Sequence, residues 1–270
     1  MKKIMFIACC LLLFTCEDVI ELDLKTATPR LVIDASITWF KKTSGNNQLI
    51  KLTLTAPYYN TNVPPATGAT VSITDTHNNT YNFIEENNSG IYRNQSFIPE
   101  INGVYKLKII YKNEVYTATE ILTPVVPIDK VEQKSNGGFS GEEIEIKAYY
   151  TDPKDFKNYY FFEFINRESN KLCLDVYDDK FIEGNQFFAF YSNENIKKGD
   201  ELIIQNHGVS QRFYEYMVIL LQQSYNESGN PFEVQPATLR GNCINDTNPE
   251  NYPFGYFRAS EVSVFNYIIE

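Results

Sequence analysis

The chain has 270 residues, of which 34 are acidic and 24 are basic, and its formal net charge is −10. This acidic balance argues against a nucleic-acid groove, which needs a basic stripe to displace counterions, and against anionic-lipid binding through a polybasic patch. With 43% hydrophobic and 14% aromatic residues, the chain has enough apolar material for one large or two modest domains. We therefore expect a folded protein that does not bind nucleic acid.

The N-terminal segment has two lysines, an apolar run over residues 4–14, and then Cys16. This run is too short for a helix across a bilayer, which takes about 20 residues, and the pattern is typical of a secretory signal. Leu13, three places before Cys16, resembles a bacterial lipobox, in which the cysteine is diacylated and becomes the first residue of the mature protein. Thr15 departs from the usual Gly, Ala or Ser, and the alternative is an ordinary signal with Cys16 as a spare thiol.

We expect residues 1–15 to be a lipoprotein signal peptide and residues 16–28 to be a lipidated tether. The lipid on Cys16 would be the protein's covalent group, with no cofactor besides it. Loss of the signal removes two lysines and takes the formal charge from −10 to −12. Lipid must then hold the protein at the membrane, because the mature chain is too acidic to be held by charge.

The next part of the chain alternates apolar and polar residues with a period near two, which is typical of half-buried strands. The segments between them carry Gly, Pro, Asn and Asp, which suit turns. Candidate strands are 31–40, 48–56, 69–74, 80–85, 90–97, 104–112 and 115–122. Seven short strands without a helix between them predict an antiparallel sandwich of immunoglobulin or fibronectin type over residues 29–124. Without crossover helices, we expect no parallel sheet.

Two prolines in residues 123–127 favour an extended connector, so we place a domain boundary between residues 124 and 125. A second β-rich domain, residues 125–270, is predicted to follow. Its candidate strands are 128–134, 143–150, 159–166, 171–177, 186–191, 201–205 and 261–269. One amphipathic helix is expected near 210–225, within SQRFYEYMVILLQQS. The strand at 159–166 is apolar on both faces, so we expect it to be central or covered.

Two cysteines remain once the signal and the lipidation site are set aside. In an exported protein, Cys173 and Cys243 predict either one disulfide or two separately buried thiols. Sequence gives no distance between the two, so both possibilities stay open.

Residues that carry chemistry are few. The two histidines, His77 and His207, fall in a turn and at a strand end, outside any metal or triad spacing. No metalloprotease, nucleophile-elbow, P-loop or dinucleotide-binding motif is present. We therefore expect no enzyme activity.

Acidic residues in two segments could offer oxygens to calcium. They are Asp175, Asp178 and Asp179 in DVYDDK, and Asp246 in a tail loop. Neither segment has the glycine and terminal glutamate of a regular calcium loop, and solvated acidic loops are the more usual explanation. We expect no metal site and keep these four residues as weak calcium candidates.

The chain is rich in aromatic residues, with 19 Tyr and 19 Phe against one Trp. In a β protein most of them form cross-strand pairs in the core. Tyrosines on loops give large contact area with a polar tip, so Tyr58, Tyr59 and Tyr252 are weak candidates for a binding surface.

Several stretches, taken in order, resemble one known family. They are the lipobox cysteine, PRLVI at 29–33, GATVSITD at 68–75, SGIY at 89–92, NPF at 230–232, GN at 241–242 and FGYFRAS at 254–260. In this order they are similar to a family of uncharacterised Bacteroidota lipoproteins, catalogued as a domain of unknown function and often encoded beside TonB-dependent outer-membrane receptors. The resemblance covers nearly all of the mature chain. It implies an outer-membrane lipoprotein that works with a SusC-like, TonB-dependent β-barrel receptor, and it supplies no ligand and no catalytic residues.

The resemblance also gives a meaning to Glu17 and Asp18. Surface lipoproteins of this phylum tend to carry a short acidic run after the cysteine, so these two residues are predicted to sort the protein to the cell surface. The expected function is that of a lipid-anchored outer-membrane accessory protein that assists cargo capture or delivery. The alternatives are a free-standing surface binder of glycans or proteins and, less favoured, a hydrolase with a carboxylate pair.

Overall fold

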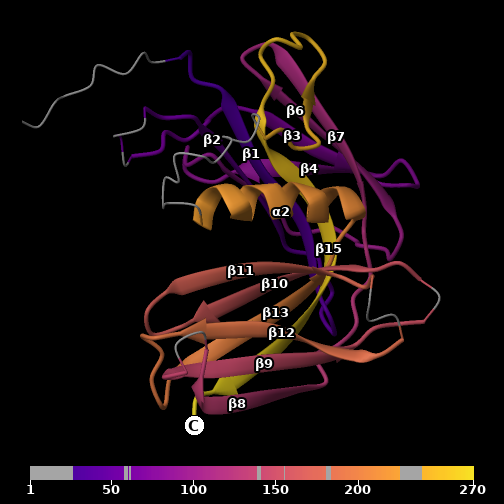
Figure 1. Cartoon of the computed structure of the whole chain (residues 1–270). Helices are drawn as coiled ribbons and strands as arrows, with labels where there is room; N and C mark the ends of the chain where they lie inside the picture. Colours follow the sequence, from indigo (N-terminus) through magenta and orange to yellow (C-terminus); the bar gives the residue numbers. More distant parts are fainter. Residues whose placement is uncertain are drawn as a thin grey trace, which may run out of the picture.

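The computed structural model describes residues 27–57, 60, 62–138, 141–154, 156–180, 184–225 and 239–270. Within these residues the protein is built from strands, with one helix, α2 (Gln211–Tyr225). Figure 1 shows two β lobes, one above the other, with α2 between them. The prediction of a mainly β protein, with an immunoglobulin- or fibronectin-like sandwich followed by a β-rich part that carries one helix, is therefore confirmed.

The N-terminal lobe is a sandwich whose two sheets are joined through one shared strand. Its strands are β1 (Leu31–Phe40), β2 (Gln48–Leu54), β3 (Thr70–Thr74), β4 (Thr80–Glu85), β5 (Ile91–Asn94), β6 (Val104–Tyr111), β7 (Glu114–Ile121) and β14 (Ile244–Asn245). β4 pairs with β5 in one sheet and with β3 in the other. Alternate residues of both sheets fill the space between them, among them Ile33 and Leu52 from one side and Ile73 and Leu107 from the other.

The C-terminal lobe packs a three-stranded sheet against the far end of the large sheet. Its strands are β8 (Lys130–Gly137), β9 (Glu143–Thr151), β10 (Tyr159–Asn166), β11 (Lys171–Asp178), β12 (Gln186–Asn193) and β13 (Glu201–Gly208). The small sheet has the order β12-β9-β8. Its buried residues Ile146, Ala148 and Tyr150 meet Phe162 and Phe164 of β10 in a second core.

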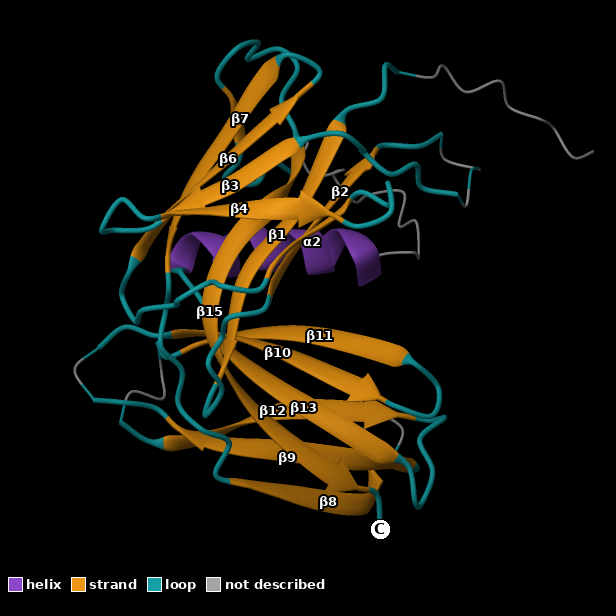
Figure 2. Cartoon of the chain, turned by 180° about the vertical axis from the view of Figure 1, so that it is seen from behind, coloured by secondary structure: helices purple, strands orange, loops and turns teal. Residues whose placement is uncertain are grey.

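The last strand, β15 (Phe254–Ile268), belongs to both lobes. Residues 254–262 pair in parallel with β1, and residues 262–268 pair antiparallel with β13. In Figures 1 and 2 this strand runs from the N-terminal lobe down into the C-terminal lobe. The prediction of no parallel pairing was wrong, because the connection between the two parallel strands is not a local crossover but most of the chain.

Helix α2 covers the outer face of β10 and β11. Phe213 and Met217 of the helix are buried with Tyr159 and Phe161 of β10 and with Tyr256 of β15. The opposite face of β10 lies in the second core. The expectation that this strand is central or covered is confirmed, and its burial on both faces explains the unbroken aromatic run at its start.

The remaining predicted elements agree with the structure within a few residues, with two exceptions. The closing strand was expected at 261–269 and begins at Phe254, and the two-residue strand β14 was not predicted. Gly68 and Gly90 lie just before β3 and β5 and have positive φ angles of +77° and +72°, a conformation that glycine adopts without strain. The boundary between residues 124 and 125 stays a prediction; β15 returns across it into both lobes.

Candidate functional site

The structure covers only some of the residues singled out from the sequence. Cys16, Glu17 and Asp18 lie outside the described residues, as do Tyr58 and Tyr59. Among the loop tyrosines, Tyr252 is therefore the one whose surroundings are known.

Tyr252 lies between two arginine side chains. The guanidinium carbon of Arg30 is 3.9 Å from the centre of the tyrosine ring, and that of Arg240 is 3.7 Å from it. Two planar guanidinium groups this close to one centroid do not fit on the same face, so the ring lies between them. Such cation–π contacts are favourable because the faces of the ring carry partial negative charge. Both faces of Tyr252 are thus occupied, and no aromatic or sugar ring has room to stack on it.

The register of the parallel strands brings Arg30 to Tyr252. Val32 of β1 pairs with Phe254 of β15, and Arg30 and Tyr252 each lie two residues before one member of this pair, just outside the strands. Arg30 Nη1 also donates to the carbonyl oxygens of Glu250 (3.0 Å) and Tyr252 (3.3 Å). These bonds hold the guanidinium group in place.

Two glycines allow Arg240, the second arginine that contacts Tyr252, to reach the tyrosine ring. A Cβ on Gly241 would lie 1.7 Å from the carbonyl oxygen of Gly255, and a Cβ on Gly255 would lie 2.0 Å from that of Ile33. Gly255 also has a φ of +89°. Three layers of backbone therefore meet here at distances that only glycine permits.

The two arginines that contact Tyr252 differ from Arg93 and Arg167 in their charge partners. Arg93 pairs with Glu86 (2.5 Å) and Arg167 pairs with Glu201 (2.6 Å). Among the described residues, neither Arg30 nor Arg240 forms an ion pair with a carboxylate. In a chain with net charge −10, two positive groups therefore lie side by side without a carboxylate partner among the described residues.

The tail loop that contains the calcium candidate Asp246 is fixed by hydrogen bonds. Glu114 accepts from the side-chain amides of Asn251 (2.6 Å), Asn245 (3.1 Å) and Asn248 (3.2 Å) and from the hydroxyl of Tyr116. The bond from Tyr116 contributes most to the lowered pKa of Glu114. Thr117 Oγ1 donates to Asp246 at 2.9 Å. These acidic and amide groups serve to hold the loop against β7.

The other calcium candidates also have structural partners. Asp175 accepts from the hydroxyl of Tyr177 and from the amide of Val176 (2.8 Å), while burial raises the pKa of its carboxyl. Asp179 is buried and accepts from the backbone amide of Asn158. Asp178 of β11 pairs in register with Tyr159 of β10, and Tyr159 belongs to the apolar cluster under α2. Within the described parts of the chain, no group of three or more His, Cys, Asp or Glu side chains is arranged to hold a metal ion.

The two cysteines lie in different cores. Cys243 is buried in the N-terminal core, whereas Cys173 packs against the C-terminal core. No disulfide joins them. Of the two possibilities left open by the sequence, the structure therefore has two separate thiols.

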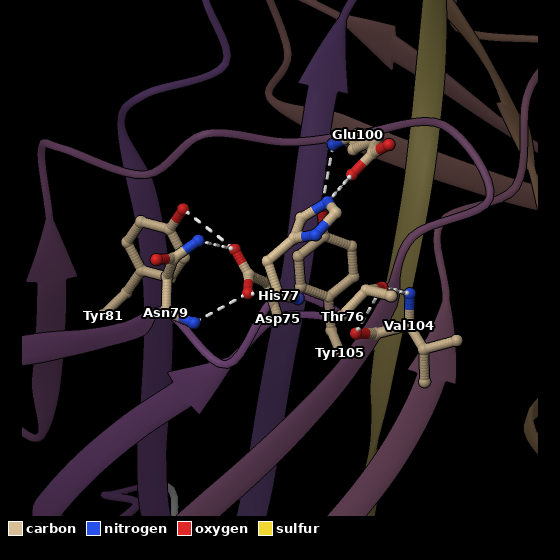
Figure 3. A network of polar contacts seen from close by, with 8 residues as sticks. All are labelled: Asp75, Thr76, His77, Asn79, Tyr81, Glu100, Val104 and Tyr105. Carbon is tan, nitrogen blue, oxygen red and sulfur yellow. Dashed lines mark hydrogen bonds and ion pairs between the residues drawn. The ribbon is translucent and has the colours of Figure 1, made fainter.

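The histidines take no part in a catalytic group. His77 lies in the turn between β3 and β4, where Asp75 accepts from the backbone amides of His77 and Asn79 at 2.8 Å each (Figure 3). The His77 ring contacts Glu100 at 3.0 Å, and both side chains are exposed. This turn residue was expected from its Asp-Thr-His-Asn-Asn setting.

His207 is buried beneath helix α2. Arg258 Nη1 donates to its Nδ1 at 2.7 Å, so the ring proton lies on Nε2, which has no hydrogen-bond partner. Glu163 Oε2 is 3.6 Å from Nε2, too far for a hydrogen bond. Burial, and then the charge of Arg258, lower the pKa of His207 to about 4. His207 lies at the C-terminal end of β13, as the sequence predicted, and only 1% of it is exposed.

A second buried polar group joins the lobes at the start of the helix. Ser210 caps α2, accepting from the amide of Phe213 at 3.3 Å, and donates to Glu120 of β7 at 3.1 Å. The hydroxyl of Tyr256 donates to the same carboxylate at 3.2 Å. Burial raises the pKa of Glu120 despite these bonds. The arrangement connects three elements and does not expose a reactive atom.

A surface groove of about 520 Å³ lies where β4 and β5 separate. The two strands pair only at two positions, and beyond them Asn94 bridges the gap by donating to the carbonyl oxygen of Asn82 at 2.7 Å. The lining residues are Asn82, Ile84, Glu85, Glu86, Arg93, Asn94, Gln95 and Ser96. The groove thus offers amide and hydroxyl groups, with its one arginine already paired to a carboxylate.

Sequence reasoning identified Tyr252 and missed its two partners. Arg30 was noted only as part of PRLVI, and nothing in the residues around Arg240 marks it for an aromatic contact. The available signal was the glycine at 241, which requires a close backbone approach at the residue next to Arg240.

A family model described as "Domain of unknown function (DUF4249)" matches residues 17–265. The chain belongs to this family. The match supplies no activity, ligand or partner for this DUF4249 protein. A search of curated proteins found no match. Among the described residues, no helix is long and apolar enough to cross a membrane.

Solved structures resemble this DUF4249 protein only distantly. A DUF4785 family protein from Legionella pneumophila has a TM-score of 0.26 and 7% identity, covering 66% of this chain. The chain spans 52% of that protein's length. A two-domain fibronectin type-III segment of chicken tenascin has a TM-score of 0.22 and 8% identity, covering 69% of this chain and 89% of the segment. The chicken CNTN1 FN1–FN3 domains have a TM-score of 0.24 and 13% identity, covering 68% and 61%. Nothing about chemistry or partners follows from likenesses at this level.

Proposed function

We propose that this DUF4249 protein is a lipid-anchored lipoprotein of the outer membrane that assists a SusC-like, TonB-dependent transporter in capturing or delivering cargo. The observation that carries the proposal is the position of the family match, which begins at residue 17, directly after the cysteine of LFTC. The domain therefore starts where a lipidated mature chain would start. The resemblance to lipoproteins encoded beside TonB-dependent receptors supports the choice of partner.

The course of the N-terminal chain is compatible with this anchor. Arg30 and Tyr252 lie at the end of the N-terminal lobe that is remote from the C-terminal lobe, because β15 starts there and ends on β13. A tether over residues 16–28 would reach at most about 45 Å when fully extended. The C-terminal lobe would then project away from the membrane surface, where a neighbouring receptor could contact it.

We further propose that the protein has no enzyme activity. Three of the four calcium candidates, Asp175, Asp179 and Asp246, accept hydrogen bonds from tyrosine, backbone or threonine donors. A hydrolase would need a pair of carboxylates that converge on an open cleft. A screen of chromogenic glycosides that shows turnover lost in Glu86→Gln, a carboxylate of the groove, would favour it.

Two measurements test the anchor and the partner separately. Radiolabelled palmitate should enter the full-length protein and the Cys173→Ala control but not the Cys16→Ala variant. Affinity purification from detergent-solubilised outer membrane should recover a β-barrel receptor together with the wild-type protein. Recovery of the lipidated protein without any β-barrel partner would refute the accessory role while leaving the anchor intact.

Exposure at the cell surface is part of the same proposal and has its own test. Protease added to intact cells should digest the wild-type protein. The Glu17→Ala, Asp18→Ala double variant should become protected if these residues direct surface sorting. Equal digestion of both proteins would refute that role for the acidic pair.

The groove between β4 and β5 favours a second candidate function, a free-standing surface binder. Its uncharged amide and hydroxyl groups suit a glycan or a peptide backbone. Purified protein should then bind such a ligand without a transporter, and Gln95→Ala with Ser96→Ala, both exposed in the groove, should weaken binding. Glycan-array binding that is unchanged in this variant would exclude the groove.

A further inference from the structure

The stack of Arg30, Tyr252 and Arg240 presents nitrogen donors rather than an aromatic surface. Both faces of the tyrosine are covered by guanidinium carbons at 3.9 and 3.7 Å. Arg30 uses one terminal nitrogen for two backbone carbonyls, which leaves the rest of its fork for other acceptors. Arg240 is exposed. A planar guanidinium group suits the paired oxygens of a phosphate, with which it forms two parallel hydrogen bonds.

The charge environment also points to an anionic ligand. Stacking on one ring holds two positive groups near each other, and neither forms an ion pair with a carboxylate of the described residues. Arg93 and Arg167 are paired with glutamates, whereas the exposed Arg212, like the two arginines of the stack, has no ion pair among the described residues. Within the part of the chain that the structure describes, these two guanidinium groups are therefore open to an anionic partner.

The position of the stack identifies which anion is closest. Arg30 lies directly after the proposed tether, so the lipid on Cys16 would hold the stack within about 50 Å of the membrane surface. Tethering at this range gives the surface a high effective concentration, so even a weak contact becomes populated. Tyrosine and arginine are also the side chains that suit the headgroup layer.

We propose that Arg30, Tyr252 and Arg240 contact the phosphate groups of lipid headgroups and thereby orient the N-terminal lobe on the membrane. The inference rests on the proposed lipid anchor. It does not require a polybasic patch, because the lipid holds the protein and the two arginines only select which end faces the membrane. Each arginine near an anionic surface is expected to change the ratio of docked to undocked protein about five-fold.

The test uses the lipidated full-length protein and hydroxyl-radical footprinting of Tyr252. Protein is reconstituted into phospholipid vesicles containing phosphatidylglycerol, into vesicles of uncharged galactolipid that contain no phosphate, and into maltoside micelles. We expect Tyr252 to be oxidised more slowly in phospholipid vesicles than in the other two, while Tyr149 of the C-terminal lobe reports equal oxidation. Each variant is compared with itself in micelles, so a change in the intrinsic exposure of Tyr252 cancels.

Arg30→Gln and Arg240→Gln should each remove most of this protection, whereas the control Arg167→Gln, which removes the same charge from the other lobe, should retain it. Equal oxidation of Tyr252 in the two kinds of vesicle, or protection that survives both substitutions, would overturn the inference. Protection in galactolipid vesicles on addition of inorganic phosphate would assign the site to a free phosphate and overturn the membrane contact. Failure of the protein to enter any vesicle would instead refute the lipid anchor on which the inference rests.

Discussion

The buried histidine under α2 makes the stability of the protein depend on pH in a calculable way. His207 is 1% exposed, and its pKa falls from the ordinary value of 6.5 to about 4. The charged groups that face it are Arg258 of β15, which donates to Nδ1, and Glu163 of β10. The first opposes protonation and the second favours it, and burial opposes it further.

The sign follows from which state binds the proton more readily. The unfolded chain takes up the proton near pH 6.5, whereas the folded protein resists it until about pH 4, so acidification through this window favours unfolding. From pH 7.5 to 4.5, this one group should lower the free energy of unfolding by about 2.5 kcal/mol. The effect sets in as the pH falls through 6.5 and levels off once the pH lies well below the folded pKa of about 4.

Other buried groups titrate with the opposite sign, so a matched variant is needed. Burial raises the pKa values of Glu120, Asp152 and Asp175, and these carboxyls favour the folded state as the pH falls. His207→Gln keeps an acceptor for Arg258 and removes only the histidine's titration. The difference in pH dependence between the wild-type protein and this variant therefore isolates His207.

The assay is urea unfolding followed by circular dichroism, with both proteins carrying Cys16→Ser to prevent lipidation. The stability of the wild-type protein should fall relative to that of His207→Gln by about 2.5 kcal/mol between pH 7.5 and 4.5. His77→Gln, which alters the exposed histidine beside Glu100, is the control and should follow the wild-type curve. Parallel curves for the wild-type protein and His207→Gln would refute the assignment of a neutral, buried imidazole.

Three further substitutions or treatments probe the packing that positions the candidate site. Gly255→Ala should destabilise the protein by about 3 kcal/mol or more, because its Cβ would lie 2.0 Å from a carbonyl oxygen at φ +89°; Gly68→Ala, with a positive φ but open space, should cost only about 1 kcal/mol in the same urea titration. Ser210→Ala should lower stability by about 1 to 2 kcal/mol through loss of the helix cap and of a donor to Glu120, and a thermal midpoint equal to wild type would contradict this. Cys243 should resist alkylation in the folded protein at pH 8, because burial raises its pKa to about 12, and should react once urea is added; rapid labelling without urea would argue against its burial.

The local sequence pattern predicted the strands well where one face of each strand is buried. β6 alternates buried and exposed residues from Tyr105 to Tyr111, and its period of two was visible in the letters. The run of aromatics at the start of β10 predicted burial on both faces for the same reason. Each of these signals depends only on neighbouring residues and on the water or core that they face.

The pairing of β1 with β15 left no such signal. Val32 and Phe254 are neighbours in space and far apart in sequence, and periodicity gives the faces of a strand without naming its partner. The candidate site depends on this pairing, because the register places Arg30 beside Tyr252. A tyrosine on a loop could be selected from composition, but its two guanidinium partners follow from the tertiary fold alone.

Because β15 belongs to both lobes, it restricts how far the two lobes can move relative to each other. Two domains on a linker generally move relative to each other, whereas here the backbone of one strand hydrogen-bonds with both lobes and changes partner at Val262. Glu261, beside this point, accepts from the amide of Val125 in the connector and pairs with Lys41 at 2.7 Å. Bending the lobes apart would break these contacts together with the Ser210 to Glu120 bond. An anchor or a membrane contact at Arg30 would therefore fix the direction of the C-terminal lobe as well, because the two ends are parts of one continuous sheet.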